Sequence, residues 1–344
     1  MTSEAMRESL SLAIHEASQT AEARRRIVDL ARRLSFTETE LGQLALVVTE
    51  AATNLLKHAH AGELVVRVLE SHGMTGIEIL ALDRGPGMTN VAACLRDGYS
   101  TTGSPGTGLG AIGRLSTEFD IYSQPGQGTA LLMRLWRPPP AHLVSTPPIE
   151  AGVVCVAKHG EPISGDAWVV EATVERAIVL IADGLGHGPD AAMAANAAVR
   201  VLHAHPGLSP GELVERANGA LRPTRGAALG IAEVSLATQS VRYAGIGNIA
   251  GAIILPGRNQ HLASHNGIVG HAVRKIQEFT YPWSPEALLI LHSDGLATHW
   301  DLNTYPGLTA RHPSLIAGVL YRDFARGRDD VTVMVAKETH AFRW

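Results

Sequence analysis

The chain has 344 residues and a mass of 36.5 kDa, which exceeds the usual size of one hydrophobic core and predicts two domains. Hydrophobic residues make up 45% and charged residues 18%, which is typical of a globular protein and excludes a disordered one. The net charge of -4 and the lack of any basic block argue against nucleic acid as a partner.

The N-terminal segment predicts neither export nor a membrane anchor. Charged residues interrupt it from Glu4 to Glu16, so it lacks the apolar core of a signal peptide. No uncharged apolar run reaches the roughly 18–20 residues that a membrane span needs. Cys94 and Cys155 lie far apart, which excludes a disulfide scaffold and a cysteine zinc site. We therefore expect a cytoplasmic protein that does not bind membranes.

The first half predicts the order helix, helix, strand, strand, glycine-rich loop, helix, strand, strand. A long helix is expected to start at Thr37, because Thr37 and Glu40 have the spacing of a capping box. Apolar residues then follow at helical spacing along one face. The helix after the glycine-rich loop is expected to begin near Leu109. The four strands are expected at 64–69, 77–82, 119–122 and 129–135.

A proline-rich seam after Arg137 divides the chain. Consecutive prolines remove backbone donors and favour extended geometry, so the seam predicts a stiff linker. We expect domains at 1–136 and 150–344, joined by a linker at 137–149. The second half predicts many strands and few helices, hence a β-sandwich flanked by helices. Its helices are expected at 189–203 and 210–221, and its strands at 152–157, 168–170, 177–182, 229–234, 240–244, 251–255, 288–291 and 331–335.

Polar residues on the long helix form part of a first candidate site. Glu50, Asn54 and Lys57 are four and three residues apart, so they share one helix face; a solvated polar face is the alternative explanation. Downstream, a predicted strand ends at Asp83, whose carboxylate can accept a hydrogen bond from an exocyclic amine. Gly85 and Gly87 allow the chain to turn tightly around a flat base, although the same pattern is common in ordinary turns.

A glycine-rich loop, GSPGTGLG at 103–110, precedes the next predicted helix. Its backbone N–H groups and the helix N-terminus are suited to phosphate binding. A flexible connector has a similar composition, so the loop alone is weak evidence. The order and spacing of the polar helix face, the Asp83 turn and this loop are more specific than any one of them.

The combination Glu50-xxx-Asn54, Asp83-x-Gly85-x-Gly87, Gly106-x-Gly108-x-Gly110 and Gly128-Thr129 resembles the GHKL ATPase superfamily over roughly residues 15–136. Within it, the segment is similar to RsbT-like anti-sigma-factor serine kinases. The resemblance implies a Bergerat-type α/β sandwich that binds ATP and Mg²⁺. It implies that Glu50 is the catalytic base, that Asn54 holds Mg²⁺ and that Asp83 binds the adenine amine. The ATP-binding residues that it implies are Asn54, Lys57, Asp83, Gly85, Gly87, Gly106, Gly108, Gly110 and Thr129.

Acidic residues at four strand or loop junctions of the second half form a second candidate site: Asp166, Asp183, Asp294 and Asp329. Each alone is also compatible with a simple turn. If the four carboxylates converge, a repulsion of roughly 1–4 kcal/mol per close pair requires cations between them. Hard divalent ions, Mg²⁺ or Mn²⁺ rather than Zn²⁺, prefer such oxygen ligands, and a pair of them can clamp a phosphate and activate water. His187 lies nearby in sequence, either as an acid near neutral pH or as a loop-shaping or solvated residue.

The stretches SGD, ADGLGHGPDAAMAA, YAGIGN, LHSDGL and GRDDVTVMV resemble the SpoIIE- and RsbX-type PPM serine/threonine phosphatases over about residues 150–336. The resemblance implies an αββα sandwich that binds two Mn²⁺ or Mg²⁺ ions. It implies that Asp183, Asp294 and Asp329 are metal ligands and that the Gly184 carbonyl binds the second ion. Asp166 would contribute directly or through water.

The two resemblances together imply a bifunctional bacterial signalling protein of α/β (α+β) class, with a serine kinase and an opposing phosphoserine phosphatase. They imply substrates among STAS-domain antagonist or stressosome proteins in sigma-factor partner switching, with a sigma factor as a further candidate partner. Two alternatives remain open for the first domain. It binds ATP only as a structural ligand while holding a sigma factor or antagonist, or it senses nucleotide and regulates the phosphatase.

Overall fold

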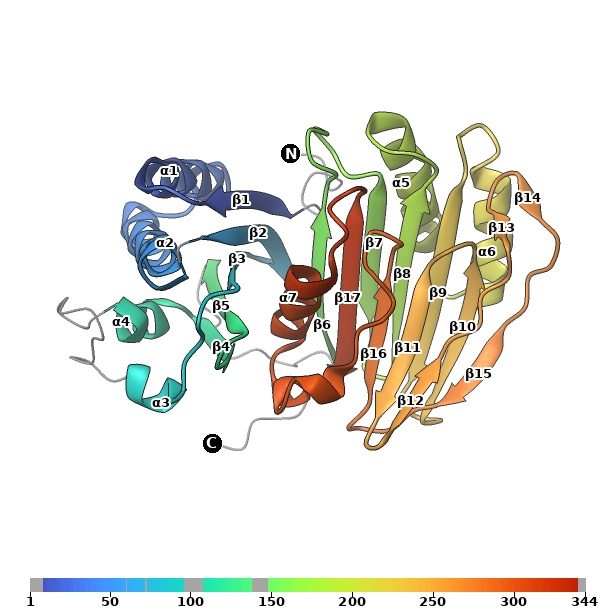
Figure 1. Cartoon of the computed structure of the whole chain (residues 1–344). Coiled ribbons are helices and arrows are strands. Elements are labelled where there is room, and N and C mark those ends of the chain that lie inside the picture. Colours follow the sequence, from blue (N-terminus) through green and yellow to red (C-terminus); the bar gives the residue numbers. More distant parts are fainter. Residues whose placement is uncertain (1–8, 60, 72, 96–107, 138–147, 340–344) are drawn as a thin grey trace. The chain divides into compact units, whose positions relative to one another are not determined.

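The structure is a computed structural model that describes residues 9–59, 61–71, 73–95, 108–137 and 148–339 (Figure 1). The chain forms two compact units. The N-terminal unit contains Ser9–Leu143 together with Asp301–Arg322, and the C-terminal unit contains Val144–Trp300 together with Asp323–Trp344. The predicted linker falls largely within 138–147, which lies outside the described residues. The expected mixed α/β class is confirmed.

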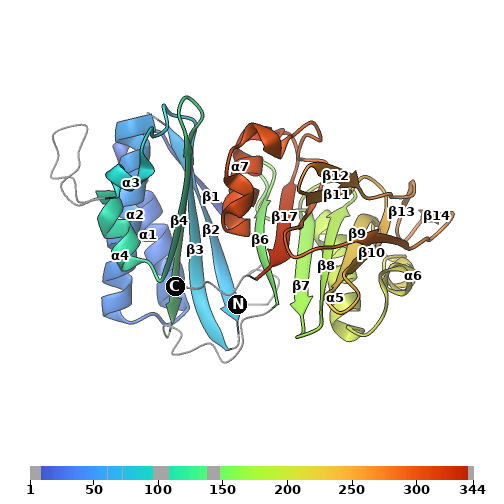
Figure 2. The ribbon, with the colours of Figure 1, turned by 90° about the horizontal axis from the view of Figure 1, so that it is seen from below.

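The N-terminal unit is built on a five-stranded antiparallel sheet with the order β1-β2-β3-β5-β4. Helices α1, α2 and α4 cover one face of this sheet (Figure 2). The strands are β1 (Leu10–Ile14), β2 (Gly62–Ser71), β3 (Met74–Asp83), β4 (Glu118–Gln124) and β5 (Gly128–Arg137). The helices on this side of the chain are α1 (Ala17–Arg33), α2 (Glu38–Ala59), α3 (Val91–Cys94) and α4 (Gly108–Leu115).

The predicted start of the long helix is confirmed. The Thr37 amide donates to Glu40 Oε2 at 2.6 Å, and the Glu40 amide donates to Thr37 Oγ1 at 3.4 Å, so both arms of the capping box are present. The four predicted strands are confirmed and run longer than expected. The predicted order, which starts with a helix, is wrong, because the strand β1 precedes α1 and pairs antiparallel with β2. This strand is only five residues long, too short for its alternation to stand out from the helix that follows.

The opposite face of the same sheet is covered by α7 (Pro313–Phe324), which sequence periodicity did not predict (Figure 2). A side chain at Gly318 would approach Leu80 and Leu82 of β3 within 3.1–3.2 Å, so the helix packs closely. Two short 3₁₀ helices, Leu302–Thr304 and Leu308–Ala310, precede it. The compact units thus divide the chain differently from the predicted domains, which place 301–322 in the second domain.

The C-terminal unit contains two five-stranded sheets, ordered β15-β10-β9-β8-β7 and β12-β11-β16-β17-β6. An apolar core that includes Val179, Tyr243 and Leu289 joins the two sheets. A second core packs α5 (Pro189–Ala204) and α6 (Pro210–Ala220) onto the first sheet, so the predicted helix-flanked sandwich is confirmed. None of the helices in the described ranges is long and apolar enough to cross a membrane. The strands are β6 (Ile149–Val156), β7 (Asp166–Ala172), β8 (Arg176–Gly184), β9 (Ala227–Ser235), β10 (Ser240–Ile246), β11 (Ala250–Leu255), β12 (Arg258–His261), β13 (Gly267–Ile268), β14 (Ala272–Val273), β15 (Phe279–Pro282), β16 (Leu288–His292) and β17 (Val331–Glu338).

Candidate functional site

Helices α2 and α4 bring two predicted site residues to the start of the second helix. A Cβ atom added to Gly108 would lie 2.8 Å from Glu50 Oε2 and 3.7 Å from Asn54 Oδ1. Both side chains therefore point from α2 toward the N-terminus of α4, instead of forming only a solvated face. Backbone N–H groups at a helix N-terminus favour anions, so a phosphate bound there would lie within reach of both side chains.

The end of β3 presents Asp83 as a half-buried acceptor. The amides of Gly85 and Thr129 both donate to Asp83 Oδ1, at 2.8 Å and 3.1 Å, while no donor from the described part of the chain hydrogen-bonds to Oδ2. Burial raises the pKa of Asp83, while the two amides and the nearby Arg322 guanidinium oppose that rise. Arg322 also donates to the Asp83 carbonyl at 2.9 Å, which links the 301–322 segment to this turn.

Two glycines around Asp83 hold backbone positions that no larger residue can occupy. Gly87 has φ +66°, and a Cβ atom there would lie 2.2 Å from the Gln124 carbonyl oxygen. Gly128 has φ +88°, and its Cβ atom would lie 2.0 Å from the Asp83 carbonyl oxygen. The loop after β3 and the turn between β4 and β5 therefore approach each other closely enough to form one wall.

The remaining residues predicted for ATP have less distinctive positions. Lys57 is exposed in the last turn of α2, beside His58. Gly110 lies in the first turn of α4. Gly106, which belongs to the predicted phosphate loop, lies outside the described residues. The described part of the predicted nucleotide site thus consists of the α2 pair, the Asp83 turn and the start of α4.

The four acidic junctions of the C-terminal unit meet at one end of its two sheets. Asp166 and Asp183 face each other as Cα partners on β7 and β8. Asp294 follows β16, and its Oδ2 accepts a hydrogen bond of 2.7 Å from Asn248. Asp329 precedes β17. Antiparallel pairing of β16 with β17 brings the segments that carry Asp294 and Asp329 together.

Burial and repulsion between neighbouring carboxylates raise the pKa values of Asp183 and Asp166. Burial, followed by the charges of Asp166, Asp294, Asp329 and Asp330, raises the pKa of Asp183 to about 9. Burial also raises the pKa of Asp166 to about 7, and the charges of Asp330 and Asp294 act in the same direction. Hydrogen bonds to Asp166 from Ser293 and Thr332 oppose the shift. In the absence of a cation, the cluster is therefore not fully ionised near neutral pH.

The donor set fits divalent cations that prefer oxygen ligands. All of the converging side chains are carboxylates, which are hard ligands of the kind that Mg²⁺ and Mn²⁺ bind. A Cβ atom at Gly184 would lie 2.0 Å from the Ala191 carbonyl oxygen, so the residue that follows Asp183 must be glycine. Within the described ranges, no group of three or more His, Cys, Asp or Glu side chains is already arranged to hold a metal ion.

Several residues that support the acidic cluster were not predicted as site residues. Ser293 Oγ donates to Asp166 Oδ2 at 2.6 Å and accepts from the Thr332 amide at 2.9 Å. Asp330 is buried, and its Oδ1 accepts from the Lys158 amide at 2.9 Å. The pair of acidic residues in RDDVT was the only sequence signal for Asp330. His187 is exposed, and its Nδ1 lies 2.6 Å from Glu161 Oε1.

The affinity of the metal-free C-terminal unit for Mn²⁺ is expected to rise as the pH increases from about 7 to about 9. Asp183 and Asp166 hold protons that a cation must displace. Because these raised pKa values let the folded state bind more protons than the unfolded chain, the stability of the chelator-treated protein should fall over the range from about 4 to about 9. Mn²⁺ titrations by calorimetry and melting curves at several pH values would test both trends. An affinity that does not depend on pH would contradict the proposed proton displacement.

Comparisons with known proteins assign a family to each half of the chain. A family model described as histidine kinase-like ATPase domain matches residues 14–135, and one described as Stage II sporulation protein E (SpoIIE) matches residues 173–338. The chain is 31% identical over 108 residues to the serine/threonine-protein kinase RsbT of Bacillus subtilis, covering 31% of this chain and 81% of RsbT. It is 26% identical over 149 residues to the phosphoserine phosphatase RsbX of the same organism, covering 43% of this chain and 75% of RsbX.

One solved structure supports the fold of a part of the chain. It is described as "The bacterial stressosome: a modular system that has been adapted to control secondary messenger signaling". The alignment has a TM-score of 0.52 and 25% sequence identity, and it covers 55% of this chain and 99% of that one.

Proposed function

We propose that the chain both phosphorylates and dephosphorylates serine, because it belongs to two families with these opposing activities. Residues 14–135 belong to the RsbT-like histidine kinase-like ATPases, and residues 173–338 belong to the SpoIIE-type PPM phosphatases. The substrates that we propose are STAS-domain antagonist or stressosome proteins of sigma-factor partner switching. The similarity to a kinase and to a phosphoserine phosphatase of one organism supports this pairing. The observation that carries the proposal is the meeting of acidic residues from four separate junctions.

For the phosphatase reaction, Asp183, Asp294 and Asp329 would bind the cations with the Gly184 carbonyl, and Asp166 would contribute directly or through water. When bound, two Mg²⁺ or Mn²⁺ ions neutralise phosphate charge and activate water for attack on phosphorus. The protein itself fixes the orientation of the ligands. Asn248 holds one oxygen of Asp294, as described above. A carboxylate that is already hydrogen-bonded loses less conformational freedom when it binds a cation.

For the kinase reaction, Glu50 would orient the attacking serine hydroxyl and accept its proton, and Asn54 would hold the Mg²⁺ that accompanies ATP. Phosphoryl transfer depends mainly on in-line positioning and charge neutralisation, so a weak base at Glu50 is sufficient. Asp83 Oδ2 would accept a hydrogen bond from the adenine amine. It lies beside the wall formed by the loop that carries Gly87 and the turn that carries Gly128. The start of α4 at Gly108 would receive the phosphates.

A transfer assay separates catalysis from simple nucleotide binding. The full chain carrying Asp183→Asn, which cannot remove its own product, is incubated with a STAS-domain antagonist, Mg²⁺ and ATP labelled at the γ-phosphate. We expect labelled phosphoserine on the antagonist, and a loss of about 100-fold or more in rate when Glu50→Gln is added. Glu70→Gln is the matched control, because it removes the charge of an exposed carboxylate on β2. Bound ATP without any labelled serine would overturn the kinase proposal and support a purely nucleotide-binding module.

A further inference from the structure

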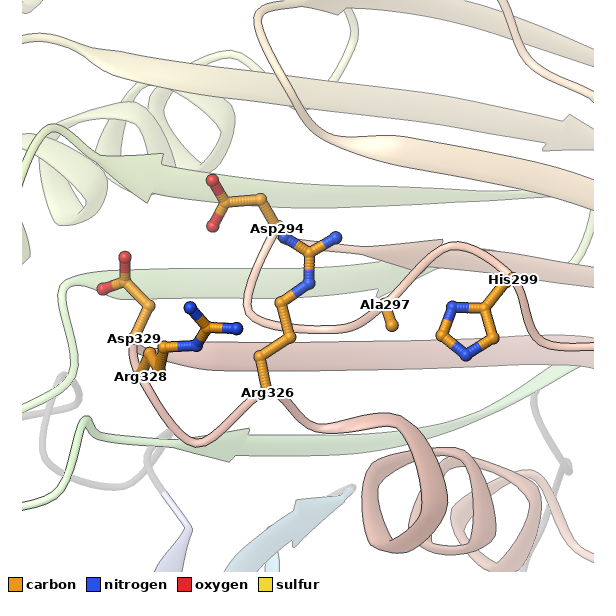
Figure 3. Close-up of a pocket in the computed structure, with 6 residues that line it drawn as sticks. All are labelled: Asp294, Ala297, His299, Arg326, Arg328 and Asp329. Atoms are coloured by element: carbon orange, nitrogen blue, oxygen red, sulfur yellow. The ribbon is translucent and has the colours of Figure 1, made fainter.

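A cavity of about 450 Å³ opens beside the acidic cluster of the C-terminal unit (Figure 3). Two of its lining residues, Asp294 and Asp329, are proposed metal ligands, so the cavity borders the reaction centre. Two more, Arg326 and Arg328, lie on the loop before β17. Figure 3 shows both guanidinium groups extending toward the space beside the two carboxylates. Cations that do not bind metal therefore form part of the wall of this cavity.

The two guanidinium groups differ in their partners from three other arginines of the unit. Arg176, Arg225 and Arg242 each form an ion pair with a carboxylate at 3.0 Å or less. Both Arg326 and Arg328 are exposed, and neither side chain makes an ion pair or hydrogen bond with any residue in the described ranges. They are therefore available to an anion that enters the cavity.

The backbone positions this loop firmly against the acidic turn. The Arg326 amide donates to the Gly295 carbonyl at 2.9 Å, and the Ala297 amide donates to the Phe324 carbonyl at 2.9 Å. Leu296 and Ala325 form an antiparallel bridge between these hydrogen bonds. The backbone of Gly295, which follows Asp294, is thus hydrogen-bonded directly to the backbone of Arg326. This hydrogen bond fixes the backbone position from which the Arg326 side chain extends.

Charge balance explains why this centre needs further cations when a substrate binds. Five carboxylates lie in the cluster, namely Asp166, Asp183, Asp294, Asp329 and Asp330. Their full charge exceeds that of two divalent cations by one, and a phosphoserine brings about two more negative charges. Two arginines at the open side would offset most of this excess. Arginine also matches phosphate oxygens with paired N–H groups, which makes it a strong and specific phosphate ligand.

We propose that Arg326 and Arg328 receive the phosphate group of the substrate, binding oxygens that the metal ions do not hold. This inference rests on the proposed phosphatase function. It identifies the preferred ligand of the cavity as a phosphomonoester dianion, and it assigns the arginines to substrate binding instead of to cation binding.

The test uses the full chain loaded with Mn²⁺ and p-nitrophenyl phosphate as substrate, with inorganic phosphate as a competitive inhibitor. Arg326→Gln and Arg328→Gln are each expected to raise KM and the phosphate inhibition constant about tenfold, and the double variant by about 50-fold or more. The Mn²⁺ concentration for half-maximal activity should stay equal or fall, because a positive charge has been removed. Arg326→Lys should restore part of the loss. Arg258→Gln, at the exposed first residue of β12, should change none of these values.

A second readout keeps the inference separate from catalysis. Inorganic phosphate should raise the Tm of the Mn²⁺-loaded wild-type protein, and the double variant should lose that rise. KM and inhibition constants within twofold of wild type in the double variant would overturn the inference. An effect confined to phosphoprotein substrates would also overturn it, and would indicate docking of an acidic protein surface instead. If wild-type protein hydrolyses no phosphomonoester, the proposed function fails, while the Tm measurement still reports on the arginines.

Discussion

Asp183→Asn is expected to reduce phosphatase activity by roughly three orders of magnitude, equivalent to about 4 kcal/mol in the activation barrier. Asp183 lies at the centre of the acidic cluster, where burial and the charges of four other carboxylates raise its pKa. Asparagine keeps the size of the side chain but removes the charge that a pair of cations requires. Hydrolysis of p-nitrophenyl phosphate at saturating Mn²⁺ measures the loss.

The stability of the same variant distinguishes a functional role from a structural one. Because burial and its neighbours raise the pKa of Asp183 to about 9, asparagine replaces a carboxyl that is mostly protonated in the metal-free protein at neutral pH, and the Tm of that protein should stay unchanged or rise. Glu175→Gln is the matched control, because it removes a carboxylate from an exposed turn at the opposite end of β8. More than a tenth of wild-type activity in Asp183→Asn, or a large drop in its metal-free Tm, would contradict the proposed role.

Glu78→Gln is expected to destabilise the N-terminal unit by about 3–5 kcal/mol. Glu78 is 1% exposed and lies between two buried arginines. Its carboxylate accepts from Arg67 at 2.8 Å, from Arg134 at 2.8 Å and from Ser314 at 2.7 Å. Burial alone would raise the pKa of Glu78, but the two guanidinium groups outweigh burial and hold it well below its usual range. Glutamine would remove the negative charge that the two buried guanidinium groups share, although Arg134 would keep its ion pair with Glu118 at 2.8 Å.

Urea unfolding monitored by a signal from the N-terminal unit measures this effect. Because the pKa of Glu78 is depressed in the folded state, its contribution is complete above the ordinary value of 4.5 and is lost as the pH falls below that value. The difference between wild type and Glu78→Gln should therefore shrink in acid. Glu70→Gln, an exposed position on β2, should change stability by less than about 0.5 kcal/mol. A similarly small effect for Glu78→Gln would show that the buried cluster does not hold the sheet and α7 together.

Local patterns predicted much of the fold. The Thr37 capping box and the apolar stripe that follows it specify α2, because both depend on residues three or four positions apart. Apolar runs that end in Asp83, Asp183 and Asp294 mark strands whose ends carry the candidate sites. The spacing of acidic and glycine residues also picked out junctions that the fold brings to one end of the two sheets of the C-terminal unit, and their functional role stays a prediction.

Tertiary relationships could not be predicted in the same way. The packing of residues 301–322 with the N-terminal sheet depends on partners more than 170 positions away, such as Ser314 with Arg134 and Glu78. Asp330 was visible only as the neighbour of Asp329, and its burial against the Lys158 amide requires β17 to pair with β6. Short strands such as β1 and β13 have too few residues to show a period. Contacts between residues that are far apart in the sequence therefore determine these features, and sequence periodicity cannot reveal such contacts.

Anomalous X-ray diffraction from Mn²⁺-soaked crystals of the full chain tests the central claim most directly. We predict two neighbouring manganese peaks in the C-terminal unit, bound by the carboxylates of Asp183, Asp294 and Asp329, with the Gly184 carbonyl on one of them. Manganese bound elsewhere, or no peak between these residues at saturating Mn²⁺, would contradict a two-cation phosphatase centre.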